Sequence, residues 1–223
     1  CSKRELLDSA RLLAQIVNAL EHYPYDDLLP CEISRYGSAA RLLQAKAACA
    51  DLMAAAHADA VHGAEICRDL QDRLVMIARV SDAGAFVNTN ALTLKRSHGD
   101  YSVMQLLYDG SEIKAVLDFV NAGEVPIAWE LIRSYSYMDC TFNAARLAAY
   151  TNEYRRYAEV SMDDLRYMPY LYLDQLLSST YGYKQYLQTG DEELLAFGRW
   201  RTEMCRYLIA NAGEVSAELV RLA

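Results

Sequence analysis

The sequence contains no apolar stretch that approaches the roughly 20 residues needed to span a bilayer. Its first residues, CSKRELLDSARLL, follow an amphipathic helical pattern and lack the apolar core of a signal peptide. No C-x-x-C pair occurs among the six cysteines, which stand singly at Cys1, Cys31, Cys49, Cys67, Cys140 and Cys205. We therefore expect a cytoplasmic protein with reduced thiols and no membrane partner.

Positive charge is also scarce, because 22 Lys and Arg residues face 30 Asp and Glu residues and leave a net charge of -8. A nucleic-acid binder needs a basic face that displaces phosphate counterions, so we expect no nucleic-acid partner. Hydrophobic residues make up 53% of the chain, which is enough for a packed core. Repeats and low-complexity linkers are absent, so one domain is the economical interpretation of the 223 residues.

Most of the chain has apolar residues at helical spacing. In residues 2–22 they recur every three or four positions and form one face. Similar patterns predict helices at about 38–56, 60–80, 126–138 and 142–158, a long one from Ser161, and a last one from about Asp191. Ser161 and Asp164 form a capping-box pattern at the start of the long helix. Residues 83–96 are polar and contain Gly and Asn, and we expect a loop there.

The middle of the chain, SHGDYSVMQLLYDGSEIKAVLDF at residues 97–119, changes period. Two short apolar runs, MQLLY and IKAVLDF, suit β-strands, and an Asp-Gly pair between them supplies turn chemistry. We therefore expect a β-hairpin of about residues 104–108 and 112–118, set among helices.

Two acidic residues frame this hairpin. Asp100 lies in the loop before the first strand, and Asp118 lies at the end of the second, between apolar neighbours that predict its burial. A hairpin brings its strand ends together, so both carboxylates and the amide of Gln105 can face one point. Such oxygen ligands suit Mg²⁺, which completes its shell with waters and substrate phosphates. A carboxylate beside the metal can accept a proton from an attacking hydroxyl.

The order of these residues resembles a kinase catalytic loop, H-R-D-x-x-x-x-N followed by D-F-G. This chain has H-G-D at residues 98–100, Gln105 five positions after the aspartate, and L-D-F at 117–119. Together with PIAWELIRSY at 126–135, the pattern resembles the aminoglycoside phosphotransferase family, which also contains choline kinases and homoserine kinase type II-like proteins. The resemblance is specific over about residues 98–135.

The resemblance implies a small-molecule kinase that transfers the γ-phosphoryl group of ATP to a hydroxyl with the help of Mg²⁺. It implies Asp100 as catalytic base, Gln105 and Asp118 as metal ligands, and Leu107 and Leu117 as part of the nucleotide-binding surface. It does not name the phosphoryl acceptor: an antibiotic, choline, an amino acid or a sugar-like metabolite all fit, and no substrate-binding residue is assigned.

The implied fold is a mostly helical α+β domain, the C-terminal lobe of a protein-kinase-like phosphotransferase. Nothing before residue 98 has the glycine-rich turn or the lysine-bearing strand of a kinase N-terminal lobe. We therefore expect residues 1–223 to be the C-terminal lobe alone, cut or processed from a longer parent. Phosphoryl transfer depends on positioning by both lobes, so we expect the isolated chain to be inactive or nearly so. The expected partners are a small-molecule acceptor, the missing lobe and a second copy of the chain.

Three positions depart from the family pattern or need a structural interpretation. Gln105 stands where the family usually has Asn, and Val120 stands where kinases have Gly. Glu130 replaces a frequent Asp that braces the catalytic loop, and we expect a structural role for it. The alternative function is a non-catalytic helical binding module that keeps the kinase-like loop as scaffold. The departure at Gln105 and the absent lobe favour this module, whereas two convergent carboxylates argue against it.

Overall fold

The structure, a computed structural model, describes residues 1–24, 27–83, 87–139 and 141–223. These residues form two compact units. Unit 1 contains residues 1–33, 88–169 and 213–223, and unit 2 contains residues 34–87 and 170–212. Each unit is built from segments that are far apart in the sequence.

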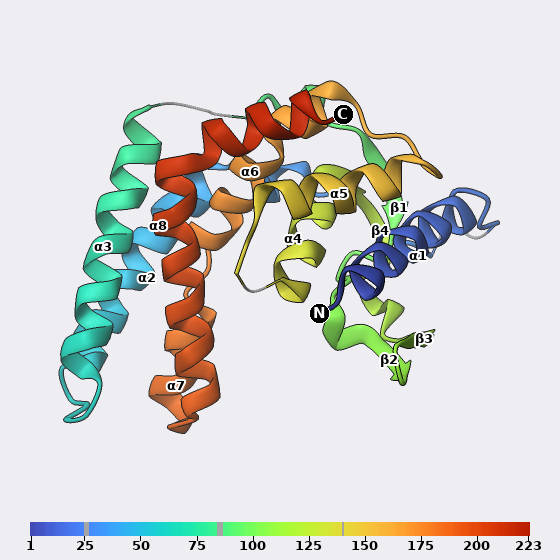
Figure 1. Ribbon diagram of the computed structural model, residues 1–223. Helices are drawn as coiled ribbons and strands as arrows, with labels where there is room; N and C mark the ends of the chain where they lie inside the picture. Colours follow the sequence, from blue (N-terminus) through green and yellow to red (C-terminus); the bar gives the residue numbers. More distant parts are fainter. Residues whose placement is uncertain (25–26, 84–86, 140) are drawn as a thin grey trace. The chain divides into compact units, whose positions relative to one another are not determined.

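The described residues are mainly helical with four short strands, so the predicted α+β, mostly helical composition is confirmed (Figure 1). The helices are Lys3–Glu21 (α1), Ala39–Ala56 (α2), Gly63–Asp82 (α3), Ile127–Met138 (α4), Ala144–Arg155 (α5), Met162–Leu177 (α6), Tyr181–Thr189 (α7) and Glu192–Arg221 (α8). Over the described ranges, no helix combines the length and the apolar character that crossing a membrane requires.

Helix α1 opens unit 1 with a capping box. The Ser2 hydroxyl accepts the N–H of Glu5 at 3.2 Å, and the Glu5 carboxylate accepts the N–H of Ser2 at 2.7 Å. These two bonds satisfy backbone donors that the first helical turn would otherwise leave unpaired. The buried face of α1, which includes Leu6 and Leu13, packs against α5 and β1. The predicted amphipathic helix is therefore confirmed.

Unit 1 also contains two antiparallel ladders. Strands β2 (Leu106–Asp109) and β3 (Glu112–Val116) form the predicted hairpin, although residues 103–105 form a 3₁₀ turn instead of extending the first strand. The second ladder pairs β1 (Leu94–Ser97) with β4 (Gly123–Pro126), and here the expected loop over residues 83–96 is wrong at its end. These strands have four residues each and little apolar alternation, so their pairing partner, not their composition, defines them.

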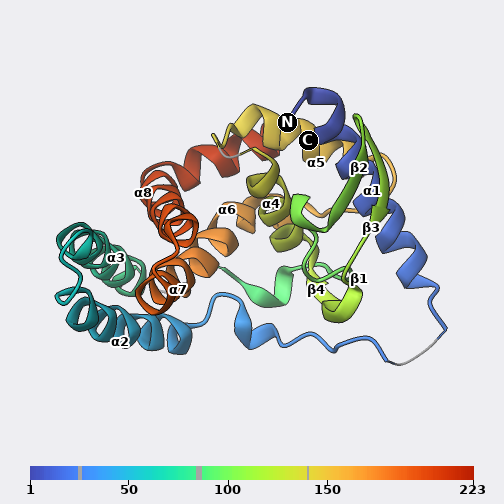
Figure 2. The ribbon, with the colours of Figure 1, turned by 90° about the horizontal axis from the view of Figure 1, so that it is seen from below.

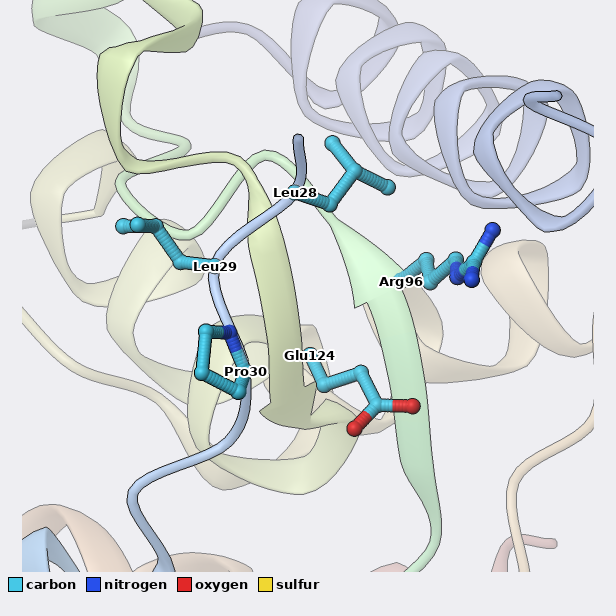
Figure 3. A pocket seen from close by; sticks show the side chains of 5 residues that line it. All are labelled: Leu28, Leu29, Pro30, Arg96 and Glu124. Atoms are coloured by element: carbon cyan, nitrogen blue, oxygen red, sulfur yellow. The ribbon is translucent and has the colours of Figure 1, made fainter. Parts of the chain in front are cut away.

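The segment after α1 adds a bridge to this second ladder. The Leu29 N–H donates to the Ala122 carbonyl at 2.9 Å, and the Leu29 carbonyl accepts the N–H of Glu124 at 2.8 Å. Between them, Gly123 allows a close approach, because a Cβ there would lie 2.3 Å from the Leu29 oxygen. Figure 3 shows this segment running beside β4, with Arg96 and Glu124 on the paired strands.

Unit 2 is helical over its described residues. Helices α2 and α3 lie side by side (Figure 2) and enclose a core with α7 and α8. The buried residues of this core are Cys49, Ala56, Ile66, Leu70, Tyr183, Tyr186 and Leu195. Two tyrosines here, Tyr183 and Tyr186, donate their hydroxyls to Asp69 and Asp59 at the edge of the core.

The long helix expected after Ser161 is interrupted. Its capping box is confirmed, since the Asp164 N–H donates to the Ser161 hydroxyl at 3.0 Å and the Asp164 carboxylate accepts the Ser161 N–H at 2.9 Å. The helix nevertheless ends at Leu177, and α7 starts at Tyr181. Arg73, fully buried on α3, donates to the carbonyls of Leu177 and Ser179, which a continuous helix would have used internally.

Five of the six cysteines are described, and all five are free thiols. Cys49 and Cys205 are buried, and burial raises the pKa of both thiols. Cys140 lies outside the described residues.

Candidate active site

The loop between β1 and β2 is fixed by a buried histidine. The N–H of Asp100 donates to Nδ1 of His98 at 3.3 Å, so the ring proton belongs on Nε2. From there Nε2 donates at 2.8 Å to the carbonyl of Leu117, the residue directly after β3. The imidazole also packs on Phe119, with 4.5 Å between ring centroids. The His98 side chain therefore links the loop at Asp100 to the segment that carries Asp118.

The carboxylate of Asp100 is held on both oxygens. Gln105 Nε2 donates to Oδ2 at 3.3 Å, and Arg133 Nη2 donates to Oδ1. The side chain keeps 30% of its surface exposed, so a ligand can reach it. The structure thus brings together two of the predicted site residues, Asp100 and Gln105, and adds Arg133, which the sequence analysis missed.

Glu130 anchors the backbone next to Asp100. Its side chain is fully buried on α4, and Oε1 accepts the N–H of Tyr101 at 3.1 Å. Burial raises the pKa of Glu130, whereas the Ser97 hydroxyl, the Tyr101 N–H and the neighbouring His98 and Arg133 act in the opposite direction. The structural role expected for Glu130 agrees with this hydrogen bond.

Asp118 has an unusual backbone. Its φ of 61° and ψ of 63° place it in the left-handed region, which Asp tolerates better than most residues but which stores strain. The expected burial is wrong, since Asp118 and both its neighbours are exposed. Apolar neighbours therefore do not imply a buried acid here. The Leu117 N–H donates to the Gln105 carbonyl at 2.9 Å and so holds the backbone before Asp118 next to that of Gln105.

Leu107 and Leu117 lie on one face of the hairpin. Leu106 pairs with Val116 and Leu107 with Ala115, so the alternation of side chains puts Leu107 and Leu117 on the same side. They are 50% and 43% exposed, whereas Leu106 on the opposite side is buried. The predicted nucleotide-surface residues therefore form an open apolar face next to Gln105.

Two surface pockets of unit 1 are lined in part by the segment after α1. One, of about 310 Å³, is lined in part by Tyr23, Phe119 and Val120. The other, of about 210 Å³, lies between the Leu28–Pro30 segment and the Arg96–Glu124 pair (Figure 3). Neither pocket is lined by Asp100 or Asp118, so we place the candidate site on the exposed loop and hairpin.

The model of the phosphotransferase enzyme family matches residues 2–160, which is 159 of the 223 residues. The chain belongs to the phosphotransferase enzyme family. The match contains the whole loop and hairpin, while the helices after Val160 lie beyond it. Among curated proteins, no sequence gives a significant match.

Phosphotransferases of this family act with a metal and a nucleotide, so the site should offer side-chain oxygen atoms that can bind a metal ion. Over the described residues, no group of three or more His, Cys, Asp and Glu side chains could hold a metal ion. The candidate donors are the carboxylates of Asp100 and Asp118 and the amide of Gln105, of which a hydrogen bond joins Asp100 and Gln105. Gln105 turns its Nε2 toward Asp100, which leaves Oε1 as the atom able to contact a cation. Such a sparse oxygen set fits Mg²⁺, because that ion usually keeps several waters and takes phosphate oxygens.

Proposed function

We propose that this chain is the C-terminal lobe of an ATP-dependent small-molecule kinase with a protein-kinase-like fold. The observation that carries the proposal is the Asp100 carboxylate, held on both oxygens and still accessible, beside the hairpin that bears Asp118. In the reaction, Asp100 accepts the proton of the acceptor hydroxyl. The hydroxyl oxygen forms a bond to the γ-phosphorus, the bond from that phosphorus to the β–γ bridging oxygen breaks, and ADP leaves.

Asp118 and Gln105 are the proposed metal ligands. When bound, Mg²⁺ neutralises charge on the phosphates. The strained backbone at Asp118 supports this role, because backbone strain in non-glycine residues clusters at functional sites. Its exposed carboxylate can reach a nucleotide without rearrangement of the core.

Leu107 and Leu117 are the proposed contacts of the adenine ring. An open apolar face next to the metal ligands suits a flat aromatic base, which buries its surface there. The opposite wall and the cover over the phosphates would come from an N-terminal lobe. Within residues 1–97, the part that the structure describes contains no glycine-rich turn between strands that could play that part. The 223 residues alone should therefore turn over very slowly, if at all.

The acceptor is a small molecule that bears a hydroxyl. The net charge of -8 supports neither a nucleic acid nor an anionic membrane as partner. The other proposed partner is a second copy of this chain, which would pack on the exposed hairpin face.

The test combines nucleotide binding with phosphoryl transfer. The intact protein is here this chain together with its proposed N-terminal lobe. Calorimetric titration of the intact protein with ATP, with and without Mg²⁺, should give magnesium-dependent binding that Asp118→Asn weakens. Asp109→Asn, at the exposed turn of the same hairpin, is the matched control and should bind like the native protein. With a panel of hydroxylated metabolites and labelled ATP, Asp100→Asn should lower transfer by about 100-fold or more while nucleotide binding persists.

Two outcomes would contradict the proposal. Rapid transfer by the 223-residue chain alone would overturn the need for a second lobe. Absence of nucleotide binding in a well-folded intact protein would favour the non-catalytic binding module instead.

A further inference from the structure

We propose that Arg133 is a positioning residue that sets the orientation of the Asp100 carboxylate for phosphoryl transfer. The inference rests on the proposed function. It assigns a role to a residue on α4, a helix that follows the loop and hairpin in sequence.

The contacts of Arg133 converge on two consecutive residues of the loop. Nη2 donates to the Asp100 carboxylate, and Nη1 lies 3.4 Å from the Tyr101 carbonyl oxygen. One planar guanidinium therefore constrains a side chain and the backbone that follows it. Arginine suits this task because its donors stand in a fixed fork, whereas lysine presents a single charge on a flexible stem.

Arg133 is itself held between aromatic rings. Its guanidinium carbon lies 5.5 Å from the ring centroid of Trp129 and 5.0 Å from that of Tyr137. The three residues are four positions apart, so they stand above one another on one side of α4. Both distances are within the range of cation–π attraction. The side chain is only 12% exposed, so it has little freedom to leave this position.

The other contacts of the loop do not fix the orientation of the Asp100 carboxylate, and Arg133 does. Glu130 fixes the N–H of Tyr101, and His98 fixes the N–H of Asp100, but both act on the backbone. Gln105 reaches one carboxylate oxygen at 3.3 Å, and metal binding through its Oε1 would further constrain that side chain. Arg133 is the charged group on the second oxygen. Its removal should free the carboxylate to rotate while the backbone stays in place.

The test measures the steady-state release of inorganic phosphate from ATP and Mg²⁺ by the intact protein, because water serves as an acceptor in place of the unidentified substrate. Arg133→Ala should lower kcat by about 10- to 100-fold, the loss expected for a misplaced catalytic group, and change KM by less than about threefold. Free guanidinium should restore part of the Arg133→Ala rate in a saturable way and should not raise the rate of Asp100→Ala. Arg166→Ala, which removes an exposed arginine of α6 paired with Asp163, is the charge-matched control and should leave kcat unchanged.

A purely structural role predicts a different pattern. Arg133→Ala would then lose melting temperature and activity together, and guanidinium would not help; that pattern, or an unchanged kcat, would overturn the proposal. If the native protein releases no phosphate under any condition, the proposed function fails separately. In that case a crystal structure of Arg133→Ala still decides whether Arg133 orients Asp100, and unchanged hydrogen exchange over residues 98–105 would show that the backbone stays in place. An Asp100 rotamer identical to the native one would overturn the positioning role.

Discussion

The backbone N–H of Tyr101 donates to the carboxylate of Glu130 over 3.1 Å, although 29 positions separate the two residues. This bond joins the loop that carries Asp100 to the buried helix α4. Tyr101 is itself buried, with its hydroxyl donating to the Ser9 carbonyl at 3.0 Å. The accessible carboxylate of Asp100 therefore belongs to a loop whose next residue, Tyr101, is held by buried hydrogen bonds.

Substitution of Glu130 should separate its hydrogen bond from its charge. Glu130→Ala leaves the buried Tyr101 N–H without an acceptor, which costs about 1–3 kcal/mol, plus the effect of the cavity. Glu130→Gln keeps an acceptor and removes a carboxylate whose pKa is raised by burial. A raised pKa in the folded state means that the ionised form is penalised above that pKa, so Glu130→Gln should be at least as stable as the native protein at pH 8. Urea unfolding measures both variants, and equal destabilisation of the two would contradict this account.

Gly99 should be far less tolerant of alanine than Gly110. Both have left-handed backbones, with φ of 76° and 60°, so alanine costs about 1 kcal/mol or more at either position. A Cβ at Gly99 would also lie 2.0 Å from the Asn121 carbonyl oxygen, whereas a Cβ at Gly110 has no atom within 4 Å. Gly99→Ala should therefore displace the loop that carries Asp100 and the turn after Asp118. Thermal unfolding and nucleotide binding of the two variants test the difference, and similar behaviour would refute it.

Asp174 should make the stability of unit 2 depend on pH. Burial raises the pKa of this carboxyl from 3.8 to about 6, although the Gly37 N–H donates to it at 3.1 Å. The folded protein then binds the proton more tightly than the unfolded chain, so the free energy of unfolding falls as pH rises from about 4 to 6 and is level above that range. Asp174→Asn should thus be more stable than the native protein at pH 7.5, by up to about 3 kcal/mol, and nearly equal to it at pH 3.5.

The matched control for Asp174 is Asp163→Asn, an exposed acid at the start of α6. Its difference from the native protein should change little between the two pH values. Urea unfolding at pH 3.5 and 7.5 gives all four comparisons. Asparagine at position 174 that destabilises at pH 7.5 would show that the carboxylate is needed in its ionised form.

Arg73→Leu should be among the most destabilising substitutions in unit 2. Arg73 is fully buried and donates to the carbonyls of Leu177 and Ser179 at 3.3 and 2.7 Å. Leucine leaves these buried acceptors unpaired, so we expect a loss of about 3 kcal/mol or more. Arg68→Leu, an exposed position on the same helix, should lie within about 0.5 kcal/mol of the native protein in urea unfolding.

Local patterns in the sequence are sufficient to predict most helices and the hairpin. Leu6, Leu13 and the other apolar residues of α1 repeat at helical spacing, and the Asp-Gly pair selects a tight turn at residues 109–110. The capping box of Ser161 and Asp164 is likewise readable from four consecutive residues. Each of these features depends on interactions within a few positions of the chain.

The features that the sequence did not predict depend on contacts between segments that are far apart in the chain. Strands β1 and β4 are short and exist because residues 94–97 meet residues 123–126. The end of α6 at Leu177 depends on Arg73, about a hundred positions earlier. The ion pair of Asp100 with Arg133 has the same origin. The spacing of Trp129, Arg133 and Tyr137 on one helix was the available signal, but it does not say what the guanidinium faces. For Asp118, apolar neighbours suggested burial because the sequence does not show which end of a hairpin is left uncovered.

The chain crosses between its two units at residues 33/34, 87/88, 169/170 and 212/213, and the last two crossings lie inside α6 and α8. No single proteolytic cut can therefore release either unit as one continuous fragment. Expression of one unit by itself would require cutting α6 and α8 and joining the separate segments of that unit by new linkers. Truncations designed at conventional linkers should instead yield insoluble material.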